Sequence, residues 1–170
     1  IKLIKNKNYS FINAKTSKIK KFKSLIKKAN NIVILSGLVG DPITKKFPLL
    51  AEKINEKDIF GIIKLASLYK VPKIIFVSTC SNYGVVKKNY LANEKARLKP
   101  LSLYAKSKVK CEEYLLKSKL ECPTVLRFAT AFGWSKRMRF DLTVNEFTKN
   151  QYFKKPIDIC EVEPVEEILK

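Results

Sequence analysis

Short runs of consecutive apolar residues alternate along the chain with segments whose apolar residues recur every three or four positions. Continuous runs are typical of strands buried on both faces, and the second pattern is typical of amphipathic helices. The predicted strands are Tyr9–Ile12, Asn31–Ser36, Lys73–Ser78 and Pro123–Phe128. The predicted helices are Ser17–Ala29, with Ser17 as its cap, then Leu49–Tyr69, Leu101–Ser118 and Phe140–Asn150. This order predicts a parallel sheet with helices on both faces.

Three segments between these elements are predicted to be loops. Pro42–Pro48 is bounded by prolines, and residues 129–139 follow the last strand. Thr79–Pro100 is long and polar, and loops of that length inside compact domains are usually functional. The tail from Lys154 is charged and gives no clear pattern.

The composition describes a folded but strongly basic chain. Its 170 residues suffice for one domain with a core, and 35 Lys and Arg residues against 15 Asp and Glu give a formal charge of +20. Only four of these cations are arginines, Arg97, Arg127, Arg137 and Arg139, and the lysines are spread over nearly every segment. Because arginine is the usual reader of phosphate and guanine, we favour a solvated lysine-rich surface, with nucleic acid disfavoured as a partner. A basic module that binds anions or nucleic acid is the alternative.

The cysteine pattern argues against a zinc site. Cys80, Cys111, Cys122 and Cys160 form no C-x-x-C pair, and the chain has no histidine. Reduced thiols in a cytoplasmic protein are therefore expected. No apolar run reaches the length of a membrane span and no signal peptide is visible, so we expect no membrane partner. The chain begins at Ile1 in mid-pattern, which suggests a fragment.

Candidate chemistry centres on Tyr104 and Lys108, which lie one helical turn apart on the same face of a predicted helix. A nearby ammonium lowers the tyrosine pKa from about 10, so that the phenol can exchange a proton near neutral pH. Thr79 follows a predicted strand at its carboxyl end, where ligands bind in open α/β sheets. This combination suits interconversion of an alcohol and a ketone with a nicotinamide cofactor. Taken alone, Tyr-x-x-x-Lys is common by chance and would be an ordinary surface pair.

Further motifs occur in order around this pair, at Phe76–Gly84, Glu94, Pro100–Lys108, Leu126–Gly133 and Arg139–Asn145. Together they resemble the extended short-chain dehydrogenase/reductase superfamily, especially its NAD-dependent nucleotide-sugar epimerase/dehydratase group, over roughly residues 9–150. The resemblance implies an α/β fold, a Rossmann-like doubly wound parallel sheet. It further implies a partial NAD(P)-binding domain over residues 1–150, with residues 151–170 as an irregular tail or the start of a C-terminal substrate region. The first βαβ unit and most of that C-terminal domain are expected to be missing.

The resemblance also implies roles for individual residues. The catalytic residues are Thr79, Tyr104 and Lys108. NAD is the expected cofactor, with NADP possible. The expected cofactor-binding residues are Asn13, Ser36, Gly37, Leu38, Asn55, Val77, Ser78, Tyr104, Lys108, Phe128, Thr130 and Ala131. The expected substrate-binding residues are Thr79, Cys80, Ser81, Tyr104, Arg139 and Asn145. The expected substrate is a nucleotide-diphosphate sugar, and the full-length protein is expected to be a homodimer.

Several of these residues have a simpler interpretation from the sequence. Asn55 would be a surface helix residue, and Arg139 a surface cation. Gly37 and Gly40 would be turn formers. Cys80 is more readily a packing residue than a nucleophile, since no histidine is present to activate it. Asn13 stands where the family usually has an aspartate near the adenine.

Two departures from the family pattern bear on the reaction. The dehydratases carry Asp-Glu directly after the catalytic threonine, whereas this chain has Cys80-Ser81, which cannot act as a carboxyl acid–base pair. We therefore expect a 4-epimerase, with an NADPH-linked keto-sugar reductase as the alternative. The glycine-rich phosphate loop of the family is not in the sequence, and Gly37-x-x-Gly40 does not replace it. These 170 residues are therefore expected to bind NAD poorly on their own.

Overall fold

The computed structural model describes residues 8–16, 18, 22–39, 41–86, 90–136 and 138–157. Ser17, the expected helix cap, lies outside these residues, as do Gly40, Arg137 and Cys160. Most of the expected tail or C-terminal region at residues 151–170 lies outside them as well.

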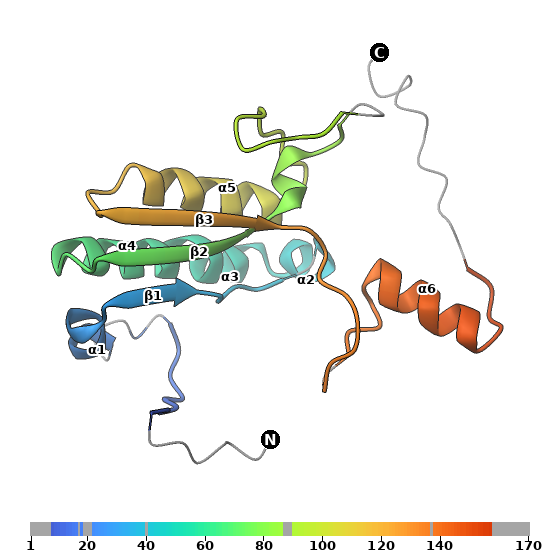
Figure 1. Cartoon of the computed structure of the whole chain (residues 1–170), viewed down its shortest axis with the longest axis horizontal. Coiled ribbons are helices and arrows are strands. Elements are labelled where there is room, and N and C mark those ends of the chain that lie inside the picture. The colour runs from blue at the N-terminus through green and yellow to red at the C-terminus, as the bar shows by residue number, and fades with distance from the viewer. Residues whose placement is uncertain are drawn as a thin grey trace.

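The described fold is built on a parallel sheet with the strand order β1-β2-β3. Its strands are β1 (Asn31–Ile34), β2 (Lys73–Thr79) and β3 (Cys122–Phe128). The register pairs Ile34 with Phe76 and Thr79 with Phe128, so all three carboxyl ends meet at one edge (Figure 1). The strands predicted at Asn31–Ser36, Lys73–Ser78 and Pro123–Phe128 are therefore confirmed.

Helical segments connect and flank these strands. They are α1 (Lys23–Lys28), α2 (Asp41–Lys46), α3 (Pro48–Glu52), the π-helix η2 (Lys53–Lys57), α4 (Asp58–Leu68), the 3₁₀ turn η3 (Cys80–Tyr83), α5 (Leu103–Leu116) and α6 (Thr143–Tyr152). The predicted helix at Leu49–Tyr69 is present as α3, η2 and α4 in succession, with a π segment that periodicity does not predict. Figure 1 shows α6 beyond the carboxyl edge of the sheet.

One face of the sheet forms the core. Ile34, Ile74 and Phe76 project from this face and are buried against α1, α4 and α5. Full burial of a side chain such as Phe76 stabilises the fold by about 1.5–3 kcal/mol. On the opposite face Val33 is 53% exposed. The expected parallel α/β sheet is thus present, while the described residues show a helical layer on one of its faces.

Two predictions about local structure are wrong. Tyr9–Ile12 is not a strand, since it has no regular structure and its apolar side chains are exposed, so it buries nothing that would hold it on a sheet edge. Pro42–Pro48 is not a loop, because it contains most of α2 and the start of α3. Both prolines lie in the first turn of a helix, where the missing N–H is not needed.

The remaining boundaries differ by a few residues. The basic helix before β1 is short, and α6 begins at Thr143 rather than Phe140. The expected boundary after residue 150 falls inside α6. Within the described part of the chain, no helix is both long and apolar enough to cross a membrane.

Candidate active site

The carboxyl end of β2 fixes the hydroxyl of Thr79. The chain leaves the strand there and enters η3, with Thr79 as the N-cap in an extended conformation. The Thr79 Oγ1 accepts a hydrogen bond from the Ser81 backbone N–H at 3.2 Å and donates to the Ser81 Oγ at 3.2 Å. Cys80 and Ser81 are both exposed in this turn. The structure therefore brings the predicted residues Thr79, Cys80 and Ser81 together at the expected edge of the sheet.

Helix α5 carries the predicted tyrosine and lysine. The helix begins after Ser102, whose Oγ caps it by accepting a hydrogen bond from the Ala105 N–H at 3.1 Å. Lys108 is only 3% exposed, and its Nζ donates to the Val77 carbonyl oxygen at 2.9 Å. The same Nζ lies 4.6 Å from the ring centroid of Phe76 and 5.7 Å from that of Tyr104. These contacts hold the ammonium between α5 and β2.

The environment opposes charge on both catalytic candidates. Burial lowers the pKa of Lys108, while the nearby Cys111 and Glu112 act in the opposite direction. Burial raises the pKa of Tyr104, and the positive charge of Arg139 counteracts that rise. Arg139 is therefore the charge that favours the phenolate form of Tyr104.

Asn55 joins this site from the π-helix η2. It is 1% exposed, which excludes the interpretation of a surface residue. Its Oδ1 accepts from the Leu38 N–H at 2.6 Å, and its Nδ2 donates to the Leu38 carbonyl at 3.0 Å. π-helical turns occur frequently at functional sites. Here the side-chain amide fixes the backbone of the segment that follows β1.

Gly37 lies where that segment approaches α5. A methyl group at Gly37 would be 3.4 Å from the Asn55 Oδ1 and 3.8 Å from the Lys108 Nζ. The predicted residue Gly37 therefore lies beside Lys108, although it is far from it in sequence, and Ser36 and Leu38 are its neighbours in the chain. Val77 and Ser78 also adjoin this region, because Val77 accepts the Lys108 hydrogen bond.

Residues after β3 extend the same edge. Phe128 pairs with Thr79 in the sheet, and the side chains of Phe128, Thr130 and Ala131 are exposed. These three residues are open to a ligand at the edge that also holds Thr79.

The loop that leads to α6 is held by Asn145. Its Oδ1 accepts from the Gly133 N–H and its Nδ2 donates to the Arg139 carbonyl, both at 3.0 Å. Arg139 pairs in turn with Asp141, with an Nε to Oδ1 distance of 3.1 Å. Asn145 is 7% exposed, and both ends of its side-chain amide form hydrogen bonds with the backbone of its own loop.

Asn13 is the predicted residue that the structure does not connect to the site. It is exposed in the irregular segment before α1, and within the described ranges no hydrogen bond joins it to the other candidates.

Sequence reasoning missed four residues next to the site: Cys111, Asn82 and Glu112, which are buried, and Arg127, which is partly buried. Cys111 donates from its Sγ to the Asn55 carbonyl at 3.0 Å. Glu112 lies one helical turn after Lys108, and Arg127 lies two positions after the packed Val125, on the same face of β3, so periodicity could have indicated that both point inward. The signal available in the sequence was a charged residue, Glu112 or Arg127, at a position that the periodicity assigns to the core-facing side.

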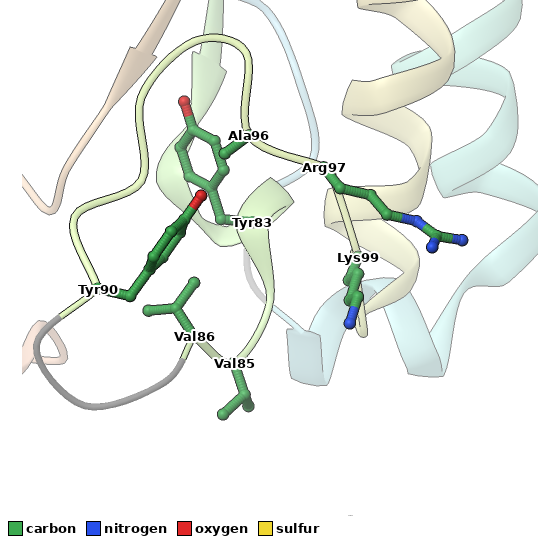
Figure 2. A pocket seen from close by; sticks show the side chains of 7 residues that line it. All are labelled: Tyr83, Val85, Val86, Tyr90, Ala96, Arg97 and Lys99. Atoms are coloured by element: carbon green, nitrogen blue, oxygen red, sulfur yellow. The ribbon is translucent and has the colours of Figure 1, made fainter.

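A cavity of about 240 Å³ lies within the loop between β2 and α5 (Figure 2). Figure 2 shows the rings of Tyr83 and Tyr90 next to each other on its wall, with the side chain of Arg97 extending away from both. The cavity is separate from the Thr79, Tyr104 and Lys108 group. Throughout the described ranges, no group of three or more His, Cys, Asp or Glu side chains is arranged to hold a metal ion.

Comparison with known proteins identifies the class to which this fold and site belong. Residues 2–160 match the NAD dependent epimerase/dehydratase family, and the chain belongs to that family. The resemblance seen in the motifs is thereby confirmed at the level of the family.

Solved structures agree in fold. UDP-glucuronic acid 4-epimerase from Bacillus cereus in complex with NAD is 23% identical over 91% of this chain and 49% of its own, with a TM-score of 0.74. UDP-N-acetylglucosamine 4-epimerase from Methanobrevibacter ruminantium in complex with UDP-N-acetylmuramic acid is 20% identical over 91% and 51%, with a TM-score of 0.78. UDP-glucose 4-epimerase from Thermotoga maritima with UDP-glucose is 21% identical over 92% and 53%, with a TM-score of 0.75. The chain spans about half the length of these proteins.

Proposed function

We propose that the protein acts as a nucleotide-sugar 4-epimerase that uses NAD. The observation that carries the proposal is the joining of Lys108, beside Tyr104, to the strand that ends in Thr79. Family membership and the three solved 4-epimerases of the same fold support it.

The chain's residues fit the nicotinamide end of the cofactor. An ammonium has three donors. Within the described part of the chain Lys108 uses one of them, toward the Val77 carbonyl, which leaves two for ribose hydroxyls. Gly37 lies against Asn55 and Lys108, and Asn55 fixes the neighbouring backbone through Leu38. Ser36, Val77, Ser78, Phe128, Thr130 and Ala131 would complete the contacts. Asn13 would lie toward the adenine. NADP in place of NAD is the alternative that a cofactor titration decides.

Proton transfer would run through Tyr104. NAD bound beside Lys108 would supply a nicotinamide able to accept a hydride from the sugar carbon and give it back. Tyr104 as phenolate accepts the proton of the 4-hydroxyl, and Thr79 donates a hydrogen bond to the same oxygen. The positive charge of Arg139 stabilises the phenolate against the opposing effect of burial, and the Lys108 Nζ lies 5.7 Å from the centroid of the Tyr104 ring. After the keto-sugar rotates in the site, Tyr104 returns the proton to its oxygen. The net change is inversion at one carbon.

Substrate contacts are proposed for the exposed edge of the site. Cys80 and Ser81 lie beside Thr79 and would face the sugar. Arg139 would attract the diphosphate, and Asn145 would hold the loop that carries Arg139. Since Cys80 and Ser81 cannot replace an Asp-Glu pair, a dehydratase reaction is disfavoured.

The experiment uses the full-length protein with UDP-glucose and related nucleotide sugars, with and without reduced cofactor. We expect interconversion of the 4-epimers without net consumption of NADPH. Turnover that requires stoichiometric NADPH would reject the epimerase in favour of a keto-sugar reductase. Absence of any nucleotide-sugar conversion would reject both.

Assembly and location are parts of the same proposal. Helices α4 and α5 pack through the stacked rings of Phe60 and Tyr114, whose centroids lie 4.4 Å apart, and Tyr114 is 39% exposed on this side of the helix pair. This surface supports a homodimer of the full-length protein, which sedimentation at several concentrations tests. The described cysteines Cys80, Cys111 and Cys122 are free thiols, which supports a cytoplasmic location.

A further inference from the structure

Five polar side chains from four segments meet behind the candidate active site. They are Ser78 on β2, Asn82 and Tyr83 in η3, Glu112 on α5 and Arg127 on β3, here called the Asn82 network. Asn82 is fully buried and Glu112 is 1% exposed. Buried polar groups of this kind fix geometry when their partners are satisfied, because any displacement leaves a donor or acceptor unpaired.

Asn82 is the residue that links the strand, the turn and the helix. Its Nδ2 donates to the Ser78 Oγ at 3.0 Å and to the Glu112 Oε1 at 2.6 Å. Because a carboxylate only accepts, the amide nitrogen must face Glu112. The backbone carbonyl oxygen of Asn82 also accepts a hydrogen bond from the Lys99 N–H at 3.0 Å, at the far end of the β2–α5 loop. Among the described residues, the Asn82 Oδ1 has no hydrogen-bond partner.

Glu112 and Arg127 complete the connection to β3. The Arg127 Nε lies 3.0 Å and its terminal nitrogen 2.6 Å from the Glu112 Oε2, a forked contact with low exposure on both sides. The other terminal nitrogen donates to the Tyr83 hydroxyl at 3.2 Å. Replacement of a buried ion pair by apolar residues is often neutral or stabilising, so stability alone does not account for this pair.

The network adjoins two of the catalytic candidates, Thr79 and Lys108. Ser78 directly precedes Thr79, and Glu112 lies one helical turn beyond Lys108. The Asn82 amide bridges these two positions, so that its hydrogen bonds set the end of β2 against α5.

We propose that Asn82, Glu112 and Arg127 are positioning residues that hold the Thr79 turn in register with the helix of Tyr104 and Lys108. Their catalytic effect rests on the proposed epimerase function. Their effect on the turn does not, since it follows from the hydrogen bonds alone.

The first test is a kinetic cycle in the full-length protein with UDP-glucose. Asn82→Ala removes both bridging donors while leaving Thr79, Tyr104 and Lys108 in the sequence. We expect kcat to fall by about 100-fold with little change in KM, as for other misplaced catalytic groups. Thr79→Val should then add little to Asn82→Ala, although it lowers kcat in the wild-type background. Asn93→Ala, in the exposed part of the same loop, is the matched control and should retain activity.

The second test does not depend on activity. Hydrogen exchange of the Ser81 and Gly84 amides should accelerate by about tenfold in Asn82→Ala, while the amides of α5 keep their protection. If Asn82→Ala does not fold, Glu112→Gln serves in both tests, because it keeps the shape and removes the charge. Wild-type kcat, additive effects with Thr79→Val, or unchanged exchange at the turn would each overturn the inference. A wild-type protein inactive on nucleotide sugars would instead reject the proposed function, and the exchange experiment would still decide the role of the network.

Discussion

The Nζ of Lys108 donates a hydrogen bond to the carbonyl oxygen of Val77 at 2.9 Å, which joins the helix of Tyr104 directly to the strand of Thr79. The acceptor is a backbone atom, so any side chain at Val77 would supply it. The same contact buries the ammonium against the ring of Phe76. The position of Lys108 therefore has two effects. The ammonium gains a hydrogen bond to Val77, and burial at the same place disfavours its positive charge.

The disfavoured charge of Lys108 predicts a pH dependence of stability. Burial lowers the pKa of Lys108 in the folded protein below its ordinary value of 10.5. Between the two values the unfolded chain binds more protons than the folded one, so this group makes the free energy of unfolding rise with pH. Lys108→Met removes the titration. Urea unfolding from pH 7 to pH 10.5 should therefore show wild type gaining stability relative to the variant as the pH rises.

Lys106→Met is the matched control, because Lys106 is exposed on the same helix. Its difference from wild type should stay constant over this pH range. A constant difference for Lys108→Met as well would show that the Lys108 ammonium is not strained by burial.

The Tyr104 hydroxyl is predicted to matter for turnover and hardly at all for folding. In the proposed reaction Tyr104→Phe removes the acid–base group, so kcat on UDP-glucose should fall by about 100- to 10,000-fold. That hydroxyl forms no hydrogen bond with the described part of the chain, so the free energy of unfolding should change by less than about 0.5 kcal/mol. Tyr114→Phe on the same helix, where the ring stacks on Phe60, should leave both quantities near wild type. Activity that survives in Tyr104→Phe would contradict the mechanism.

The free cysteines are predicted to differ sharply in reactivity. Burial raises the pKa of the Cys111 thiol to about 12, and Cys111 is fully buried, whereas Cys80 and Cys122 are exposed. Because the thiolate is the nucleophile, iodoacetamide at pH 8 should label Cys80 and Cys122 first. Cys111 should react about 1,000-fold more slowly, since labelling requires unfolding. Peptide mapping by mass spectrometry measures each site, and urea-unfolded protein should show equal rates. Rapid labelling of Cys111 in the folded protein would place it outside the core.

The sheet was predictable because β1, β2 and β3 are short continuous apolar runs, a pattern that is typical of strands in a parallel sheet. The candidate site was predictable because Thr79, Tyr104 and Lys108 belong to short motifs that can be recognised from residue types at fixed spacings in the sequence. Both signals are local. The prolines at positions 42 and 48 misled for the same reason, since a proline in the first turn of a helix gives the same local signal as one in a loop.

The Asn82 network was not predictable in this way, because it depends on contacts between distant segments. Asn82 and Glu112 are 30 residues apart, and Glu112 and Arg127 are 15 apart. The burial of Asn55 arises similarly, from a π turn and from a loop 17 residues earlier. Polar residues are read as surface residues from the sequence, and their tertiary partners reverse that expectation.

Two glycines with left-handed backbone conformations should respond differently to the same substitution. Gly84 has φ 69°, and a methyl group there would lie 2.1 Å from the Lys99 carbonyl oxygen. Gly133 has φ 106°, and a methyl group there would meet open space among the described atoms. Gly133→Ala should therefore cost only the conformational strain, about 1–2 kcal/mol. Gly84→Ala adds a clash with the Lys99 backbone, which lies in the segment leading into α5. Overpacking of this kind costs roughly a further 1–3 kcal/mol.

Urea unfolding of both variants measures the difference. Since Gly84 follows η3, displacement of Lys99 should also disturb the hydrogen bond between the Lys99 N–H and the Asn82 carbonyl. We therefore expect Gly84→Ala to accelerate exchange of the Lys99 amide, and Gly133→Ala to leave that amide protected. Equal losses of stability in the two variants would mean that the Lys99 backbone yields to the methyl group, and that the loop between β2 and α5 is not held closely against the turn.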